Sequence, residues 1–422
     1  MPYTRRDFLK HGALLVALGL TAPAFLARTA LAAENGVARA LHAVGLLEPA
    51  PDPKTVLVVV QLGGGNDGLN TIVPVGDDRY YAVRPTLAIP RDQALPLVDG
   101  LGLAPGLAAL KPLYDAQQMT IIQGVGYPNP SRSHFRAMEI WQTGSPTTSK
   151  RTGWLGRYLD ANCCGEDDPL RAVNIGNGLT RSLWTDHTLV PSITSLEGFR
   201  MPTIPGRPED HDHLLAAFTE LYGSPSAARP NEEYIRRIGQ EFQATAAQLA
   251  HIAASYHSTV EYPQNAFAQG LRQIAQVLAA DLGTRVAYVS LGGFDTHANQ
   301  ARVHDLLLTT LAEGLAAFQR DLEGLGLADR VLVLCFSEFG RRVAENGSLG
   351  TDHGAAAPLL LLGARLRGGL VGAHPSLEDL ANGDLKHAVD FRQVYATLLQ
   401  RWLGADPAAV LDGEFATLPL LR

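Results

Sequence analysis

The sequence has 422 residues, of which 46% are hydrophobic and 18% are charged, with a formal net charge of −7 and a mean hydropathy of +0.01. This balance is typical of a globular protein, and it excludes the strongly basic surface of proteins that bind nucleic acid or anionic membranes. We therefore expect no nucleic-acid partner. The three cysteines, Cys163, Cys164 and Cys335, are too few and too poorly spaced for a disulfide framework.

The first 32 residues resemble an export signal. Arg5 and Arg6 precede an apolar stretch at residues 12–26, and small residues ending at Ala32 follow it. This is the pattern of a twin-arginine signal peptide at 1–32 with cleavage after Ala32. The apolar stretch is shorter than the ~20 residues that span a membrane. We predict export by the twin-arginine translocase to the periplasm or beyond, with no stable membrane anchor.

The rest of the chain is predicted to hold a leader and linker at 33–54 and a single α/β domain at 55–422. Short apolar runs of β-formers alternate with stretches of helical periodicity, which indicates a mostly parallel central sheet between two helical layers, a three-layer sandwich. The predicted strands are 55–60, 119–124, 171–175, 189–192, 285–290, 331–336 and 357–362. The predicted helices are 133–141, 230–257, 264–282, 306–325 and 390–402.

Polar, glycine-rich loops follow several of these strands, where ligand sites of α/β sheets lie. Asp67 follows the first strand among four glycines, whose spacing matches neither a dinucleotide fingerprint nor a P-loop. It is a candidate metal ligand, with helix capping as the alternative. His304, at the start of a predicted helix, is either a further ligand or a solvent-facing residue.

The strands at 285–290 and 331–336 lead to the other candidate ligands. Asp295 and His297 follow the first of these strands, while Glu338, Asp352 and His353 follow the second. Carboxylate and neutral imidazole are the usual protein ligands of zinc or manganese. We predict one or two divalent ions at this edge of the sheet.

A possible nucleophile follows the strand at 119–124. Ser133 stands where a helix is predicted to begin, so backbone N–H groups and the positive end of the helix dipole lie beside its hydroxyl. A plain helix cap is the alternative role. Ser131 is a second candidate, and Arg132 and Arg341 are candidates to hold an anionic group.

Five ordered motifs, GGGNDGLN, SRSHF, GGFDTHANQ, SEFGRR and GTDHG, together with the export signal, resemble the family called domain of unknown function 1501. That family is thought to belong to the alkaline phosphatase and sulfatase superfamily. The resemblance implies an alkaline-phosphatase-like α/β sandwich with two metals at the strand ends. Asp67 resembles the first metal-binding Asp of the superfamily, and Ser133 or Ser131 resembles its hydroxyl nucleophile.

The resemblance also extends to the remaining candidates. Asp295 and His297 resemble the ligands of the metal on the leaving-group side, and His353 resembles the last His ligand. Glu338 falls where the superfamily has an Asp-His-Gly element, although in another alignment that element is Asp352-His353. Pro128 replaces the Cys or Ser from which sulfatases form formylglycine, so standard sulfatase chemistry is not expected.

These features predict an exported, metal-dependent hydrolase that uses a serine nucleophile on phosphate or related esters. Its expected substrate is a small-molecule or glycan-linked anionic ester. The alternative is a non-catalytic exported protein that binds a glycan or a partner on the same fold.

Overall fold

A computed structural model describes residues 52–162, 170–196, 230–256 and 258–422, together with the single residues 198, 213, 216, 217 and 220. The stretch Asp52–Arg422 forms one compact unit. The predicted signal peptide 1–32, the leader up to residue 51, Cys163 and Cys164 lie outside the described residues. Cys335 is a buried free thiol.

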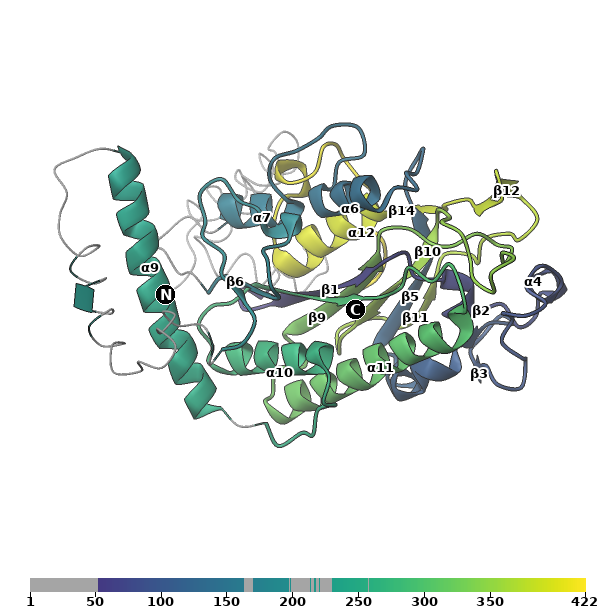
Figure 1. Cartoon of the computed structure of the whole chain (residues 1–422), viewed down its shortest axis with the longest axis horizontal. Helices are drawn as coiled ribbons and strands as arrows, with labels where there is room; N and C mark the ends of the chain where they lie inside the picture. The colour runs from purple at the N-terminus through teal and green to yellow at the C-terminus, as the bar shows by residue number, and fades with distance from the viewer. Residues whose placement is uncertain are drawn as a thin grey trace, which may run out of the picture. The chain divides into compact units, whose positions relative to one another are not determined.

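The unit is built on a nine-stranded sheet (Figure 1). Its order is β11-β5-β10-β9-β1-β8-β6-β7, and β14 also pairs with β5. Strand β10 is antiparallel to β5 and β9, and the other pairs are parallel. The strands are β1 (Val56–Gly63), β5 (Met119–Gly126), β6 (Ala172–Ile175), β7 (Ser192–Ile193), β8 (Val286–Gly292), β9 (Val331–Ser337), β10 (Ala357–Leu362), β11 (Gly369–Val371) and β14 (Val389–Asp390).

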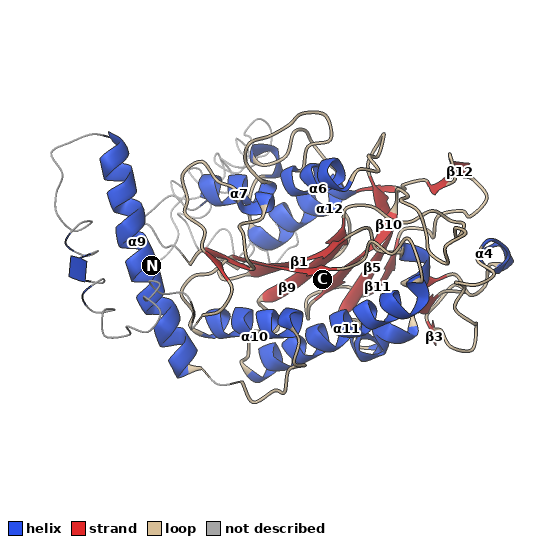
Figure 2. Ribbon diagram, viewed as in Figure 1, coloured by secondary structure: helices blue, strands red, loops and turns tan. Residues whose placement is uncertain are grey.

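Helices cover both faces of this sheet (Figure 2). One face packs against α10 (Ala266–Ala279) and α11 (Gln300–Gly324), and the other against α6 (His134–Thr143), α7 (Trp154–Asn162) and α12 (Phe391–Thr397). The predicted three-layer, mostly parallel α/β sandwich is therefore confirmed.

Strand β1 is apolar without interruption because both of its faces are buried. Val58 and Val60 belong to the core under α10 and α11, whereas Leu57 and Val59 belong to the core under α6 and α12. Successive side chains of a strand point to opposite faces, so a strand that is covered on both sides needs apolar residues at every position.

The smaller elements lie outside the main sheet. They include two short sheets, made of β2 (Ile72–Val73), β3 (Leu95–Pro96) and β4 (Gly102–Leu103), and of β12 (Leu380–Ala381) and β13 (Asp384–Leu385). Further helices are α4 (Asp78–Val83), α5 (Lys111–Asp115) and α9 (Pro230–Ser255). None of the helices in the described part of the chain is long and apolar enough to cross a membrane.

Strands β1, β5, β8 and β9 point the same way, because β10 is antiparallel to both β5 and β9. Their carboxyl ends therefore meet at one edge of the sheet. The loops that follow these strands carry the residues predicted to form the site, so the topology brings segments far apart in sequence to one place.

Candidate metal centre

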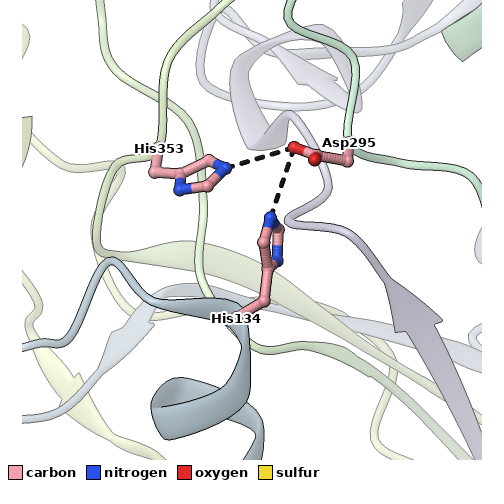
Figure 3. Close-up of side chains that lie close together, drawn as sticks. All are labelled: His134, Asp295 and His353. Atoms are coloured by element: carbon pink, nitrogen blue, oxygen red, sulfur yellow. Dashed lines mark hydrogen bonds and ion pairs between the residues drawn. The ribbon is translucent and has the colours of Figure 1, made fainter.

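The carboxylate of Asp295 faces three histidines, two of which, His134 and His353, are drawn with it in Figure 3. Its Oδ1 is 3.0 Å from Nε2 of His297, 3.1 Å from Nε2 of His353 and 3.3 Å from Nε2 of His134. The Nε2 atoms of His297 and His353 are 2.9 Å apart. Three imidazoles thus turn the same ring nitrogen toward one carboxylate oxygen.

Glu338 holds the opposite side of the His134 ring. Its Oε1 lies 2.9 Å from Nδ1 of His134 and also accepts the backbone N–H of Gly64, while its Oε2 accepts the hydroxyl of Ser337. The carboxylate is buried. Glu338 therefore orients His134 and does not reach Asp295, so its predicted place among the ligands is not what the structure shows.

The other two histidines are held in the same manner. Nδ1 of His353 lies 2.8 Å from the backbone carbonyl of Arg132, and Nδ1 of His297 lies 3.4 Å from Oδ1 of Asp352. In a neutral imidazole, an acceptor at Nδ1 places the proton there and leaves a lone pair on Nε2. Asp352 thus lies behind the His297 ring and not among the atoms around Asp295 Oδ1.

The geometry of the group fits a divalent ion. Ligands of a tetrahedral zinc ion bound at about 2.0–2.1 Å lie roughly 3.3 Å apart, close to the separations around Asp295. One nitrogen, Nε2 of His134, is buried and has no hydrogen-bond partner in the part of the chain that the structure describes. His134, Asp295 and His353 can each offer one ligand atom to a common ion.

Asp295 is ionised throughout the physiological range. Burial raises the pKa of its carboxyl group, but the guanidinium of Arg341 and the neighbouring imidazoles of His353 and His134 lower it to about 2. The backbone at Asp295 lies directly against Gly64. Only a glycine fits there, because a Cβ at residue 64 would lie 2.4 Å from the backbone nitrogen of Asp295.

Arg341 is a buried cation beside the centre. Its guanidinium donates to Asp295 Oδ1 at 2.7 Å and lies 3.4 Å from Nε2 of His297. The remaining donors bind the backbone carbonyls of Gly64, Gly65, Phe294 and Thr351. Arg341 was predicted to hold an anionic substrate group, but its N–H groups are already engaged, so it instead fixes a positive charge next to Asp295.

Asp67 is not part of this group. Its Oδ1 accepts the backbone N–H of Leu69, which makes it the cap of a short 3-10 helix, and its Oδ2 accepts from Arg84 at 2.7 Å and from Gln300. The side chain is buried. The structure thus places Asp67 as a helix cap and as the ion-pair partner of Arg84, and does not bring it to the group around Asp295.

The predicted nucleophile region lies directly before His134. Ser133 is exposed at the N-cap of α6 but makes no side-chain capping bond, and its N–H donates to Oγ of Ser131. The guanidinium of Arg132 binds Asp384 instead of facing the cluster.

A cavity of about 440 Å³ opens over the centre. Its lining includes His134, Asp295 and Glu338, together with Phe135 and Arg181. A substrate in this cavity would therefore reach His134 and Asp295.

Two histidines have surroundings in the structure that the sequence did not predict. His134 was not predicted as a ligand, although it follows Ser133 within the SRSHF motif and stands at the start of a helix. His304 was predicted to be a solvent-facing residue or a further ligand, yet it is buried and its Nε2 contacts Asn66 at 2.9 Å.

Residues 116–416 match a family described as a protein of unknown function, DUF1501. The chain belongs to this family. No curated protein sequence matches the chain significantly. The family resemblance expected from the five motifs is therefore confirmed over most of the chain.

Several solved structures are similar to this DUF1501 chain. They include the PsFucS1 sulfatase from Pseudoalteromonas sp., with 12% identity, a TM-score of 0.36 and coverage of 82% of this chain and 67% of that one. A protein in the alkaline phosphatase superfamily from Vibrio parahaemolyticus has 11% identity, a TM-score of 0.34 and coverage of 86% and 70%. The periplasmic domain of EcEptC from Escherichia coli, in complex with Zn, has 10% identity, a TM-score of 0.31 and coverage of 73% of each chain. Likeness at this level does not identify a reaction.

Proposed function

We propose that this DUF1501 protein is a metal-dependent hydrolase of phosphate or related esters. One observation carries the proposal: three histidines direct Nε2 toward Asp295 while an acceptor holds Nδ1 of each ring. Partners of this kind, behind metal-binding histidines, fix the tautomer and the ring orientation that a metal needs.

The chain supplies the ligands from three loops. Asp295 and His297 follow β8, His353 follows β9, and His134 opens the helix after β5. The group that can share one ion, His134, Asp295 and His353, offers two imidazoles and one carboxylate, which suit zinc and are also accepted by manganese. A bound divalent ion would act as a Lewis acid that stabilises negative charge developing on the ester oxygens.

Ser133 is the proposed nucleophile. Its hydroxyl is exposed, it is not engaged in capping α6, and it precedes the ligand His134 in sequence. The fixed charge of Arg341 next to Asp295 adds to the positive potential around a bound anionic ester. The substrate class we propose is a small-molecule or glycan-linked anionic ester.

The decisive experiment measures bound metal and ester hydrolysis in the same preparation. Elemental analysis is combined with a panel of phosphate and sulfate esters for the wild type, Asp295→Asn and His353→Ala, with the exposed His251→Ala as the control. We expect about one ion per chain and activity in the wild type and the control, and loss of both in the other two variants. Wild-type protein that binds no zinc or manganese would exclude the proposed mechanism.

A non-catalytic binding protein is the second candidate, and one contact favours it. The guanidinium of Arg341 already neutralises Asp295 at 2.7 Å without an ion. Ser133→Ala separates the two functions: a hydrolase that uses this serine loses most of its activity and keeps its metal. A metal-containing wild type without activity on any ester would favour the binding protein.

We also propose that the protein is exported through the twin-arginine pathway to the periplasm or the medium, on the basis of the signal at 1–32. Replacing Arg5 and Arg6 by Lys should retain the protein in the cytoplasm, as measured by cell fractionation. Unchanged export would contradict this route.

A further inference from the structure

A second cavity lies beside the candidate metal centre. It has a volume of about 760 Å³, and its wall includes Tyr127 after β5, Trp141 on α6 and Asp384 on β13. Glu338 lines this cavity and also the one over the metal centre. A ligand in the second cavity would therefore lie next to the carboxylate that orients His134.

The wall of this cavity contains a hydrogen-bond acceptor without a partner. Asp384 is 3% exposed, and its Oδ2 accepts two N–H groups from Arg132. Its Oδ1 is buried and has no hydrogen-bond partner among the described residues, and Nε of Arg342 lies 3.9 Å from it. A buried carboxylate oxygen left unpaired is costly and rare in folded proteins.

The same wall contains a donor without a partner. Trp141 is 3% exposed and stacks between Phe336 and Phe391, with ring centroids at 5.2 and 4.5 Å. Its indole Nε1 is buried and has no acceptor among the described residues. A buried indole N–H normally finds a hydrogen-bond partner, so one cavity wall contains both an unsatisfied acceptor and an unsatisfied donor.

The charges around the cavity are balanced. Arg132 pairs with Asp384, and Lys386 pairs with Asp379. Both of these cations already have a carboxylate partner, and Asp384 also has Arg342 at 3.9 Å, so its charge is neutralised. The amides of Asn129 and Asn382 also line the cavity. The ligand chemistry that fits is neutral, with hydroxyl groups that both donate and accept hydrogen bonds.

We propose that this cavity binds a neutral sugar or polyol unit, whose hydroxyl groups donate to Asp384 Oδ1 and accept from Trp141 Nε1. Tyr127, which packs against Phe391, also lines the cavity. That this unit is part of the substrate rests on the proposed hydrolase function, and it would make the substrate a glycan-linked ester. Binding of the sugar itself does not depend on catalysis.

The test uses saturation-transfer NMR on the full chain with five neutral probes measured one at a time: D-glucose, D-galactose, D-mannose, N-acetyl-D-glucosamine and myo-inositol. Trp141→Phe removes the indole N–H and keeps an aromatic ring. Ala381→Trp fills the cavity from an exposed position in its wall. Trp184→Phe is the control, because Trp184 is half-exposed and lies outside this cavity.

We expect at least one neutral probe to bind to the wild type. Binding to Trp141→Phe should be about fivefold weaker, as for the loss of one hydrogen bond. Ala381→Trp should bind no probe, and Trp184→Phe should bind as the wild type does. Thermal melts check that each variant is folded, and Ala381→Trp remains decisive if Trp141→Phe does not fold. Failure of all five neutral probes to bind, or neutral-probe binding that survives Ala381→Trp, overturns the proposal. The same neutral probes are measured with the metal-site variant Asp295→Asn. Binding of a sugar to this variant would show that the sugar site is intact even where the hydrolase function fails.

Discussion

At the residue scale, the histidines of this protein differ in what surrounds their ring nitrogens. His134, His297 and His353 each have an acceptor at Nδ1 and face Asp295 through Nε2, in a half-exposed setting. His304 is buried, and its Nε2 contacts the side-chain oxygen of Asn66. The first three are thus prepared to bind an ion, whereas His304 is part of the packing.

Glu338 provides a first prediction at this scale. In Glu338→Gln the side chain keeps its shape but loses the charge that favours a proton on Nδ1 of His134. Loss of such a partner lowers metal affinity by about 10- to 100-fold. Competition with a chromophoric chelator measures the affinity, and the exposed Glu414→Gln serves as the control. Equal affinities in the two variants would show that Glu338 does not act through His134.

His304 provides a second prediction. Burial lowers the pKa of its imidazole to about 4, whereas an unfolded histidine has a pKa of about 6.5. Between these two pKa values the unfolded chain takes up a proton that the folded chain does not. The contribution of neutral His304 to the free energy of unfolding is therefore fully present above pH 6.5 and is lost as the pH falls toward 4. Between pH 7 and pH 5 the loss is roughly 2 kcal/mol.

Urea unfolding of metal-free protein at both pH values measures this loss. The variant His304→Gln lacks the titrating group and can still donate to Asn66. We expect its free energy of unfolding to depend less on pH than that of the wild type by the same roughly 2 kcal/mol. An unchanged pH dependence would mean that His304 is protonated in the folded protein.

At the element scale, helix α7 is held against the loop that carries Arg181. A Cβ at Gly156 on this helix would lie 1.9 Å from the carbonyl oxygen of Trp184. Helix and loop therefore touch through backbone atoms, and Arg181 lines the cavity over the metal centre. The packing of a helix thus sets the position of a wall of the site.

Gly156→Ala should separate this helix from the loop. Overpacking of this kind costs about 1–3 kcal/mol, and we expect a matching fall in the free energy of unfolding. Gly324→Ala at the end of α11 is the matched control, because a Cβ there meets nothing within 4 Å. Denaturant unfolding compares the two variants. Equal free energies of unfolding for the two variants would mean that the loop moves away from the new methyl group without loss of stability.

At the scale of the whole molecule, the candidate ligands join loops that follow three strands of the sheet, β5, β8 and β9. An ion bound there would link segments that lie more than 200 residues apart in sequence, from His134 to His353. Such a link exists only in the folded state, so metal binding and folding should be coupled.

Metal loading should therefore raise the melting temperature. A ligand present at about 100 times its dissociation constant stabilises the folded state by about 2.7 kcal/mol. Scanning calorimetry with zinc or manganese, and then with a chelator, measures the shift in the wild type. His353→Ala should melt at the same temperature in both conditions. A wild-type protein that is insensitive to metal would contradict the proposed centre.

The sequence by itself determined the layers of the fold. Uninterrupted apolar runs at 56–60 and 331–336 require burial on both faces, and the helical periodicity between such runs provides the cover. Six of the seven predicted strands therefore lie within a few residues of observed strands, whereas the strand predicted at 189–192 shares only Ser192 with β7, and α11 begins at Gln300 instead of 306. Local pattern is sufficient here because the period of the apolar residues follows directly from the local backbone geometry.

Only the tertiary structure decided which polar residues meet. Asp67 and Asp295 follow strands in similar glycine-rich loops, yet Arg84 pairs with the first, and three histidines surround the second. Sequence spacing does not reveal such partners, because they come from distant segments whose positions depend on strand order. For the same reason the sequence did not reveal that His134 faces Asp295 and that Glu338 lies behind it.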